Sequence, residues 1–259
     1  MNRLTRFFPM AVGLLLGVLA VHPPAFLRAL GSFRYAGMAV IVYLLLVGFV
    51  ALLIGSHLPA DVKMVASSAP LPPEMAKLAG EYAALGFVPV GPPQEVGIAP
   101  PALLQALVHE AARAYGTVFR TGTVPARVAF DFFSLLRDGQ GGLSSGAERG
   151  GAVLPAGPGS LSQILPGASV AQLFAAHRQS LEFLQLRGLP ARPVSAATFE
   201  TDFRAGLARQ RRNFLAAPLR HAAIAIWRTA TRTTPHLGPI EKQRLARRQM
   251  GFLLTGAKR

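Results

Sequence analysis

Few residues in this chain combine types that could perform catalysis. A serine hydrolase needs a serine nucleophile, a histidine base within hydrogen-bond reach and a carboxylate that orients the base. His109, Asp131, Ser134, Asp138 and His177 supply these types. Ser134, however, stands in the run FFSLL and not in the G-x-S-x-G nucleophile turn. The sequence therefore allows, as an alternative function, a hydrolase that uses Ser134 or Asp131 with His109 or His177.

Each of these candidates also has a structural interpretation. Asp138-Gly139 is a hairpin turn signal. His177 falls on the apolar stripe of a predicted helix, where a hydrogen-bonded core histidine is the commoner outcome. His109-Glu110 does not continue into an H-E-x-x-H zinc motif, because Ala112 and Arg113 follow. We therefore expect a protein without catalytic activity.

Metal and cofactor signals are equally weak. The six histidines show no paired ligand spacing, and the chain has no cysteine. The glycines from Gly139 to Gly142 lack the Gly-Lys-Ser/Thr ending of a phosphate-binding loop. The sequence thus predicts neither a metal nor a cofactor.

Charge is the most informative property of the composition. The chain has 259 residues, of which 51% are hydrophobic and 15% charged, and its net charge is +15. This apolar content excludes a disordered tail, and the lack of cysteine excludes a disulfide scaffold. Residues 56–199 carry 10 basic and 9 acidic side chains, whereas residues 200–259 carry 13 basic and 3 acidic ones. The basicity therefore belongs to the C-terminal region, 196–259.

The C-terminal arginines are the candidate contact residues. On the predicted amphipathic helix at 239–254, the arginines gather opposite the apolar face. Such surfaces bind anionic lipid headgroups, an acidic protein partner or nucleic acid, although the arginines of a helix packed on its own domain can also be merely solvated. No zinc-finger, RNP or KH motif accompanies them, so nucleic acid is the third choice. The candidates are Arg209, Arg211, Arg212, Arg244, Arg247 and Arg248.

Two apolar runs near the N-terminus predict a membrane anchor. Residues 1–55 contain no aspartate or glutamate, and the run 36–54 has 19 uncharged residues, enough for a helix that crosses a bilayer. The first run, about 7–27, is open to three interpretations: a cleaved signal peptide, an interfacial helix or the first span of a hairpin. We favour a transmembrane helical hairpin, which places the following domain on the cytoplasmic side of a bacterial inner membrane.

The rest of the chain predicts an α+β fold. After a linker at 56–73, a helix begins near Pro73, and strands are expected at 87–90, 102–111, 115–121 and 127–136, with a fifth near Leu143. The Gly- and Pro-rich stretch 139–167 predicts a long loop, after which Ser169 caps another helix. We expect a small antiparallel sheet packed with helices at 74–195, followed by the basic helical region.

Together these features predict a membrane-anchored, non-enzymatic interaction or scaffold module. Its partners would be the lipid bilayer and, at the basic C-terminal helices, anionic lipid or an acidic protein. The sequence specifies no substrate and no oligomeric state.

Overall fold

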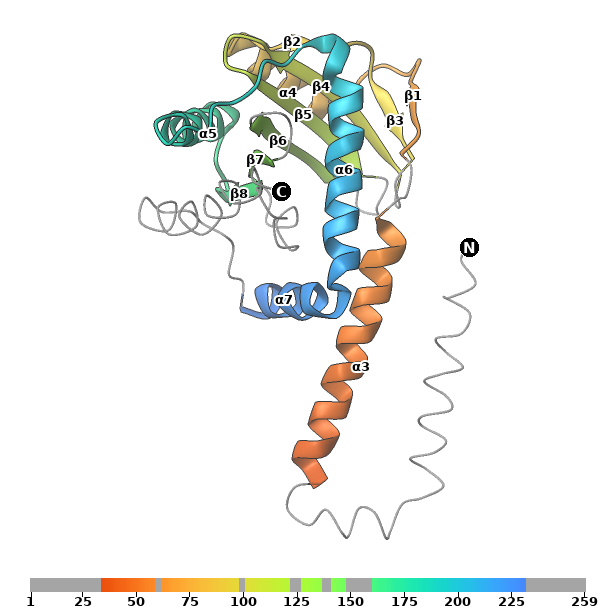
Figure 1. The fold of residues 1–259 in the computed structure, drawn as a ribbon. Coiled ribbons are helices and arrows are strands. Elements are labelled where there is room, and N and C mark those ends of the chain that lie inside the picture. Colours follow the sequence, from red (N-terminus) through yellow and green to blue (C-terminus); the bar gives the residue numbers. More distant parts are fainter. Residues whose placement is uncertain are drawn as a thin grey trace.

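The computed structural model describes residues 34–58, 62–97, 101–121, 127–136, 141–147 and 160–231. This part of the chain is α+β, as the sequence predicts, and is built around an eight-stranded, mostly antiparallel sheet (Figure 1). Some predicted features lie outside the described residues: the apolar run 7–27, the Asp138-Gly139 turn, and the helix 239–254 with Arg244, Arg247 and Arg248.

The strands cross the sheet almost in chain order. Seven lie in the order β1-β3-β4-β5-β6-β7-β8, and β2 pairs with β4. Every pair is antiparallel except β7 with β8. The strands are β1 (Met64–Ala66), β2 (Val88–Pro89), β3 (Gln94–Val96), β4 (Ala102–His109), β5 (Ala114–Thr121), β6 (Arg127–Leu136), β7 (Gly141–Gly146) and β8 (Ser160–Ile164).

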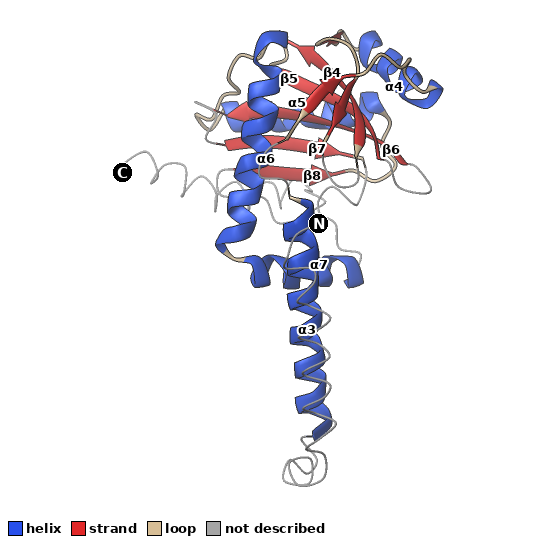
Figure 2. Ribbon diagram, turned by 90° about the vertical axis from the view of Figure 1, so that its right-hand side faces the viewer, coloured by secondary structure: helices blue, strands red, loops and turns tan. Residues whose placement is uncertain are grey.

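Helices cover both faces of this sheet (Figure 2). Two of them, α4 and α5, pack on one face, and α6 crosses the other. The hydroxyl of Ser169 accepts from the N–H of Gln172 at 3.3 Å, and the Gln172 side chain accepts from the N–H of Ser169 at 3.0 Å, which fixes the start of α5. The helices are α3 (Arg34–His57), α4 (Pro73–Ala84), α5 (Val170–Gln185), the short 3-10 helix η3 (Ala196–Thr198), α6 (Phe199–Ala216) and α7 (Pro218–Thr231).

The face under α4 and α5 is closely packed. Tyr82 of α4, Phe132 of β6 and Phe174 of α5 meet in one buried cluster. The Tyr82 hydroxyl donates to the backbone oxygen of Asp131 at 2.7 Å. A Cβ atom at Gly116 would lie 2.2 Å from the Tyr82 ring, so only glycine fits there.

The opposite face is held by the first half of α6. Tyr115 of β5, Phe133 of β6 and Phe199 of α6 form an aromatic cluster. The Tyr115 hydroxyl donates to the Asp202 carboxylate at 2.8 Å, and the guanidinium of Arg192 pairs with the same carboxylate. Burial raises the pKa of Tyr115 to about 12, so this phenol stays neutral.

Helix α3 packs against the C-terminal helices. Val47 and Ala51 are buried against Phe214 of α6 and Ala222 of α7, which lies across α3 (Figure 1). Other apolar side chains of α3, Leu44 among them, are exposed.

The predicted transmembrane hairpin is wrong. In the part of the chain that the structure describes, no helix combines the length and the apolar character needed to span a bilayer. The segment 36–54 lies in α3, whose apolar residues include those that pack on α6 and α7. A count of apolar residues does not separate such contacts from lipid contacts. The assignment to an integral protein of a bacterial inner membrane depended on the hairpin and is wrong with it.

Several strands differ from the sequence prediction. The strand expected near Leu143 is β7, but β8 lies inside the stretch 139–167 that predicted a loop. Serine and glycine have low strand propensity, and here pairing with neighbouring strands outweighs it. The strands β1 and β3 have three residues each, which is too few for an alternation of apolar and polar residues to be recognised in the sequence.

Candidate functional site

A buried polar network joins the sheet to α5. Nε2 of His177 lies 2.9 Å from Oγ of Ser134 on β6, and Nδ1 lies 2.8 Å from Oγ of Ser145 on β7. Gln163 of β8 donates to Ser145 Oγ at 2.6 Å, and Ser180 donates to Gln163 Oε1 at 3.0 Å. None of these side chains belongs to a residue more than 5% exposed. The structure thus brings two of the predicted catalytic candidates, Ser134 and His177, into contact.

The hydrogen-bond directions in this network do not suit a nucleophile. The Ser134 hydroxyl donates its one proton to the backbone oxygen of Arg113 at 2.8 Å. Nε2 of His177 must therefore carry a proton and donate to Ser134, while Nδ1 accepts from Ser145. A catalytic serine needs the reverse, an imidazole nitrogen that accepts its proton. Burial lowers the pKa of His177 to about 3, so the ring is neutral.

Asp131 lies on the other side of the sheet from this pair. It stands three positions before Ser134 on β6, and alternate strand positions face opposite ways. Its carboxylate accepts from the hydroxyl of Thr117, directly across the β5–β6 ladder. No triad of Ser134, His177 and Asp131 can form across the sheet.

His109 is held by local contacts. Its ring lies 5.2 Å from that of Phe87 and 5.9 Å from that of Phe174, measured between centroids. Its Nδ1 accepts from the N–H of Ala112 at 3.2 Å. These contacts give His109 a structural role at the end of β4.

A cavity of about 300 Å³ lies on the face that α6 covers. Strands β6, β7 and β8 form its floor, and α6 forms its wall from Asp202 to Gln210. Ser144 and Ser162 line it because they alternate with Ser145 and Gln163, which point the other way into the network at α5.

Asp131 brings a carboxylate to this cavity. Burial raises its pKa to about 6, and the hydrogen bond from Thr117 acts in the opposite direction. The carboxylate is therefore mostly ionised at neutral pH. Among the described residues, no lysine, arginine or histidine forms an ion pair with it.

Arg209 brings a cation to the same cavity. Burial lowers its pKa, and the positive charges of Arg212 and Arg192 lower it further. Positive charge thus gathers on the side of α6 that carries Arg209 and Arg212, whereas the nearby Arg192 is paired with Asp202. We call it the electropositive side of α6.

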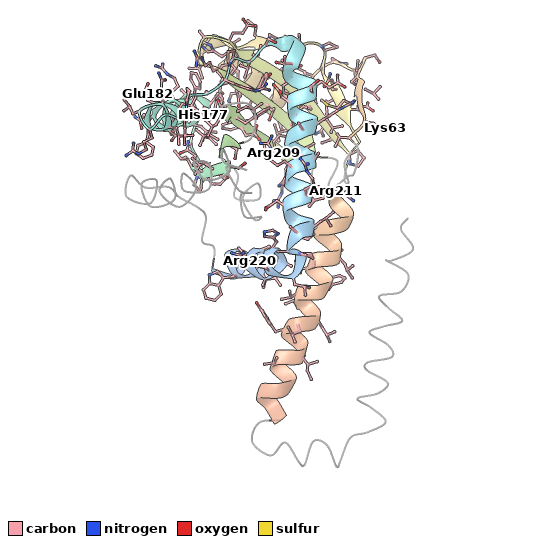
Figure 3. The ribbon with its side chains drawn as sticks, in the orientation of Figure 1. Lys63, His177, Glu182, Arg209, Arg211 and Arg220 are labelled. Carbon is pink, nitrogen blue, oxygen red and sulfur yellow. The ribbon has the colours of Figure 1, made fainter. Side chains whose placement is uncertain are left out.

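The structure divides the arginines that the sequence predicts as contact residues. An α-helix turns about 100° per residue, so Arg209 and Arg212 share one side of α6. Arg211 lies on the side opposite Arg209 (Figure 3). Nε of Arg211 is buried without a hydrogen-bond partner among the described residues. The electropositive site therefore contains Arg209 and Arg212 but not Arg211.

Sequence analysis did not single out the cavity or the serines that line it. The available signal was the alternation Ser160-x-Ser162, which becomes informative only once the segment is known to be a strand. Within the described ranges, no three His, Asp or Glu side chains gather closely enough to hold a metal ion.

Comparison with protein-family models, with curated proteins and with solved structures gave no match. The function of the site is therefore argued from its geometry.

Proposed function

We propose that this chain is a non-enzymatic interaction module that binds an acidic protein partner through the side of α6 that carries Arg209 and Arg212. The observation that carries this proposal is charge segregation. Residues 203–240 contain seven arginines and no aspartate or glutamate. The electropositive side of α6 lies within this stretch, where the repulsion from Arg212 and Arg192 that lowers the pKa of Arg209 favours a negative partner.

The ion pairs of the described residues support the same proposal. Glu200 pairs with Arg204 at 2.7 Å, and Asp202 pairs with Arg192. These carboxylates lie in the first turn of α6, ahead of the electropositive part. Arg209 and Arg212 lie farther along the helix than these carboxylates.

A protein partner fits this surface better than nucleic acid or a lipid surface. Asp131 and Asp202 line the cavity beside Arg209. A phosphate backbone or an anionic leaflet presents only negative charge and would be repelled by these carboxylates. A protein surface of mixed charge can complement both signs.

A fluorescein-labelled peptide that contains both glutamate and lysine, with glutamate in excess, tests the proposal by fluorescence anisotropy with the full chain. We expect the double variant R209A/R212A to weaken binding roughly tenfold, since each charge pair contributes up to about 1 kcal/mol. The matched control is R178A/R187A, which removes two exposed arginines, one in α5 and one in the turn that follows it. We expect less than about a twofold change from the control.

Three outcomes contradict the proposal. Equal losses in both double variants would mean non-specific attraction to a basic protein. Tighter, Arg209-dependent binding of a DNA duplex would indicate nucleic acid, and the same result with phosphatidylserine vesicles would indicate lipid.

A further inference from the structure

We propose that the cavity between α6 and strands β6–β8 receives a lysine side chain of the protein partner, with its protonated amine at Asp131. The chemistry recognised is a primary ammonium group at the end of an alkyl chain. This inference rests on the proposed function and deepens it, because it names a side chain that the partner must carry. The contact depends on Asp131, which lies in the floor of the cavity on β6.

Two carboxylates line the cavity, and they differ in their partners. Asp202 pairs with Arg192 and accepts from the Tyr115 hydroxyl at 2.8 Å. Asp131 accepts one hydrogen bond, from Thr117, and none of the ion pairs among the described residues includes it. A carboxylate has about four positions at which it can accept hydrogen bonds. A desolvated carboxylate with open acceptor positions is stabilised by a cation that can contact it.

Arg209 lines the same cavity but does not neutralise Asp131. Burial raises the pKa of Asp131 and the Thr117 hydrogen bond lowers it, and no neighbouring cation is among the causes of the shift. No ion pair joins Arg209 to Asp131 in the described part of the chain, and Arg209 already has another interaction. The amine therefore needs nothing from Arg209, and the place of a cation at Asp131 falls to the partner.

The groups beside Asp131 suit an ammonium group. Ser144 of β7 pairs with Phe133 in the β6–β7 ladder, so it is a diagonal neighbour of Asp131 on the same face, at about 7–8 Å or less. The Ser144 hydroxyl donates to the backbone oxygen of Leu161 at 3.5 Å and keeps its acceptor positions. An ammonium group is compact and has three donors that rotate together, so it can donate to both side chains. A guanidinium group binds best to both carboxylate oxygens, one of which already accepts from Thr117.

The rest of the cavity suits the methylene stem of lysine. Phe133 of β6 and Phe203 and Leu207 of α6 are partly buried apolar residues that line it. Lysine packs its four methylene groups on apolar surface while its amine keeps polar partners. Ser144 lines the cavity and is exposed, so a side chain can enter from solvent. The volume of about 300 Å³ lies at the lower end of the range for small-ligand pockets, which favours one side chain over a larger group.

A double-mutant cycle at pH 8 isolates the contact between the amine and Asp131. The labelled peptide of mixed charge is compared with a version that carries Nε-acetyllysine in place of lysine. We expect acetylation to weaken binding to the full chain by about tenfold or more, and to weaken binding to D131N by less than about twofold. The control E182Q removes an exposed carboxylate from α5 and should keep the full difference between the peptides.

Two outcomes of this cycle overturn the proposal. An equal effect of acetylation on the wild type and on D131N would mean that the amine does not contact Asp131. Equal or tighter binding of a peptide with arginine in place of lysine would mean that the cavity does not select an ammonium group.

A cavity-filling variant locates the lysine without changing charge. Gly206 lines the cavity, and a Cβ atom there would meet nothing within 4 Å. We expect G206L to remove the difference in affinity between the lysine and acetyllysine peptides. The control G80L places the same side chain on α4, where a Cβ atom also meets nothing within 4 Å, and should keep the difference. A difference that persists in G206L would place the amine elsewhere. Circular dichroism confirms that each variant is folded.

A blocked lysine, Nα-acetyl-lysine-methylamide, tests the cavity without the glutamates. In isothermal titration calorimetry at millimolar concentration, we expect it to bind the wild type and R209A/R212A but not D131N. No binding to the wild type, or equal binding to D131N, would overturn the lysine site. Pentylamine that binds as tightly as the peptide would indicate a free amine as the ligand and overturn the assignment to a partner. Peptide binding that R209A/R212A does not weaken would instead contradict the protein contact, so the two failures are distinguishable.

Discussion

The buried polar groups on the two faces of the sheet differ in how completely they are hydrogen-bonded within the chain. Under α5, the network of His177, Ser134, Ser145 and Gln163 is closed, since each member bonds to others of the same chain. Under α6, Asp131 borders a cavity and retains free acceptor positions. A closed network specifies one packing of the core, whereas an open polar cavity offers groups to a ligand. The histidine that most resembles a catalytic residue is therefore structural.

Among the substitutions that test this comparison, replacement of His177 by alanine should have the largest effect on the free energy of unfolding. The change removes the partner of Ser145 and leaves a void in a buried region, so we expect the free energy of unfolding to fall by about 3–5 kcal/mol. Urea unfolding followed by circular dichroism measures it. The control is R178A, at the next residue on the exposed side of α5, which should change stability by less than about 0.5 kcal/mol. A loss as small as in the control would mean that the network does not hold the core.

Alanine substitutions at two glycines, one on each face of the sheet, allow the packing of the two faces to be compared directly. At Gly116 a methyl group would collide with the buried ring of Tyr82, so G116A should destabilise the protein by about 1–3 kcal/mol. At Gly206 the methyl group enters open space on a helix, so G206A should stabilise it by about 0.5–1 kcal/mol. Thermal unfolding of both variants measures these two changes in stability. Changes in stability of the same sign in both variants would contradict the inferred difference in packing between the two faces.

The substitution D131N tests the buried carboxylate through its pH dependence. Burial raises the pKa of Asp131 from its usual 3.8 to about 6, so the folded state holds this proton more tightly than the unfolded chain. The stabilisation by the proton is complete at acid pH and is lost as the pH rises from about 4 through 6. Asparagine still accepts from Thr117 but cannot ionise, so D131N should be more stable than the wild type by about 1–3 kcal/mol at pH 8.

Urea midpoints at pH 4, 6 and 8 measure this difference, which should be smallest at pH 4. Glu182→Gln is the control, because that side chain is 65% exposed and the substitution should show no comparable trend. An advantage of D131N that shrinks towards pH 8 would contradict an ionised Asp131 in the cavity.

The sequence predicted those features that depend on local periodicity. The expected strand at 127–136 has the bounds of β6, and Ser169 caps α5 as its pattern indicates. His177 is buried on the apolar stripe of that helix. These features are set by neighbours a few residues away, which a single sequence contains.

Features that depend on distant pairing could not be predicted in the same way. Ser162 faces the cavity only because β8 pairs with β7, and the opposite facing of Asp131 and Ser134 matters only once α5 and α6 lie on different faces. The separation of Arg211 from Arg209 follows from helical geometry alone and could have been predicted from the sequence. The membrane hairpin was predicted because apolar residues that pack on other helices resemble those that contact lipid.

The parallel pairing of β8 has a consequence for the order of folding. Antiparallel neighbours such as β4, β5 and β6 are adjacent in sequence and form over short loops. The parallel neighbours β7 and β8 are separated in sequence by residues 147–159, and closing a longer stretch of chain costs more entropy. We therefore expect β8 to dock after the antiparallel strands have formed. Because β8 supplies part of the cavity floor, the cavity would be completed in the last refolding phase, after most of the sheet signal has returned.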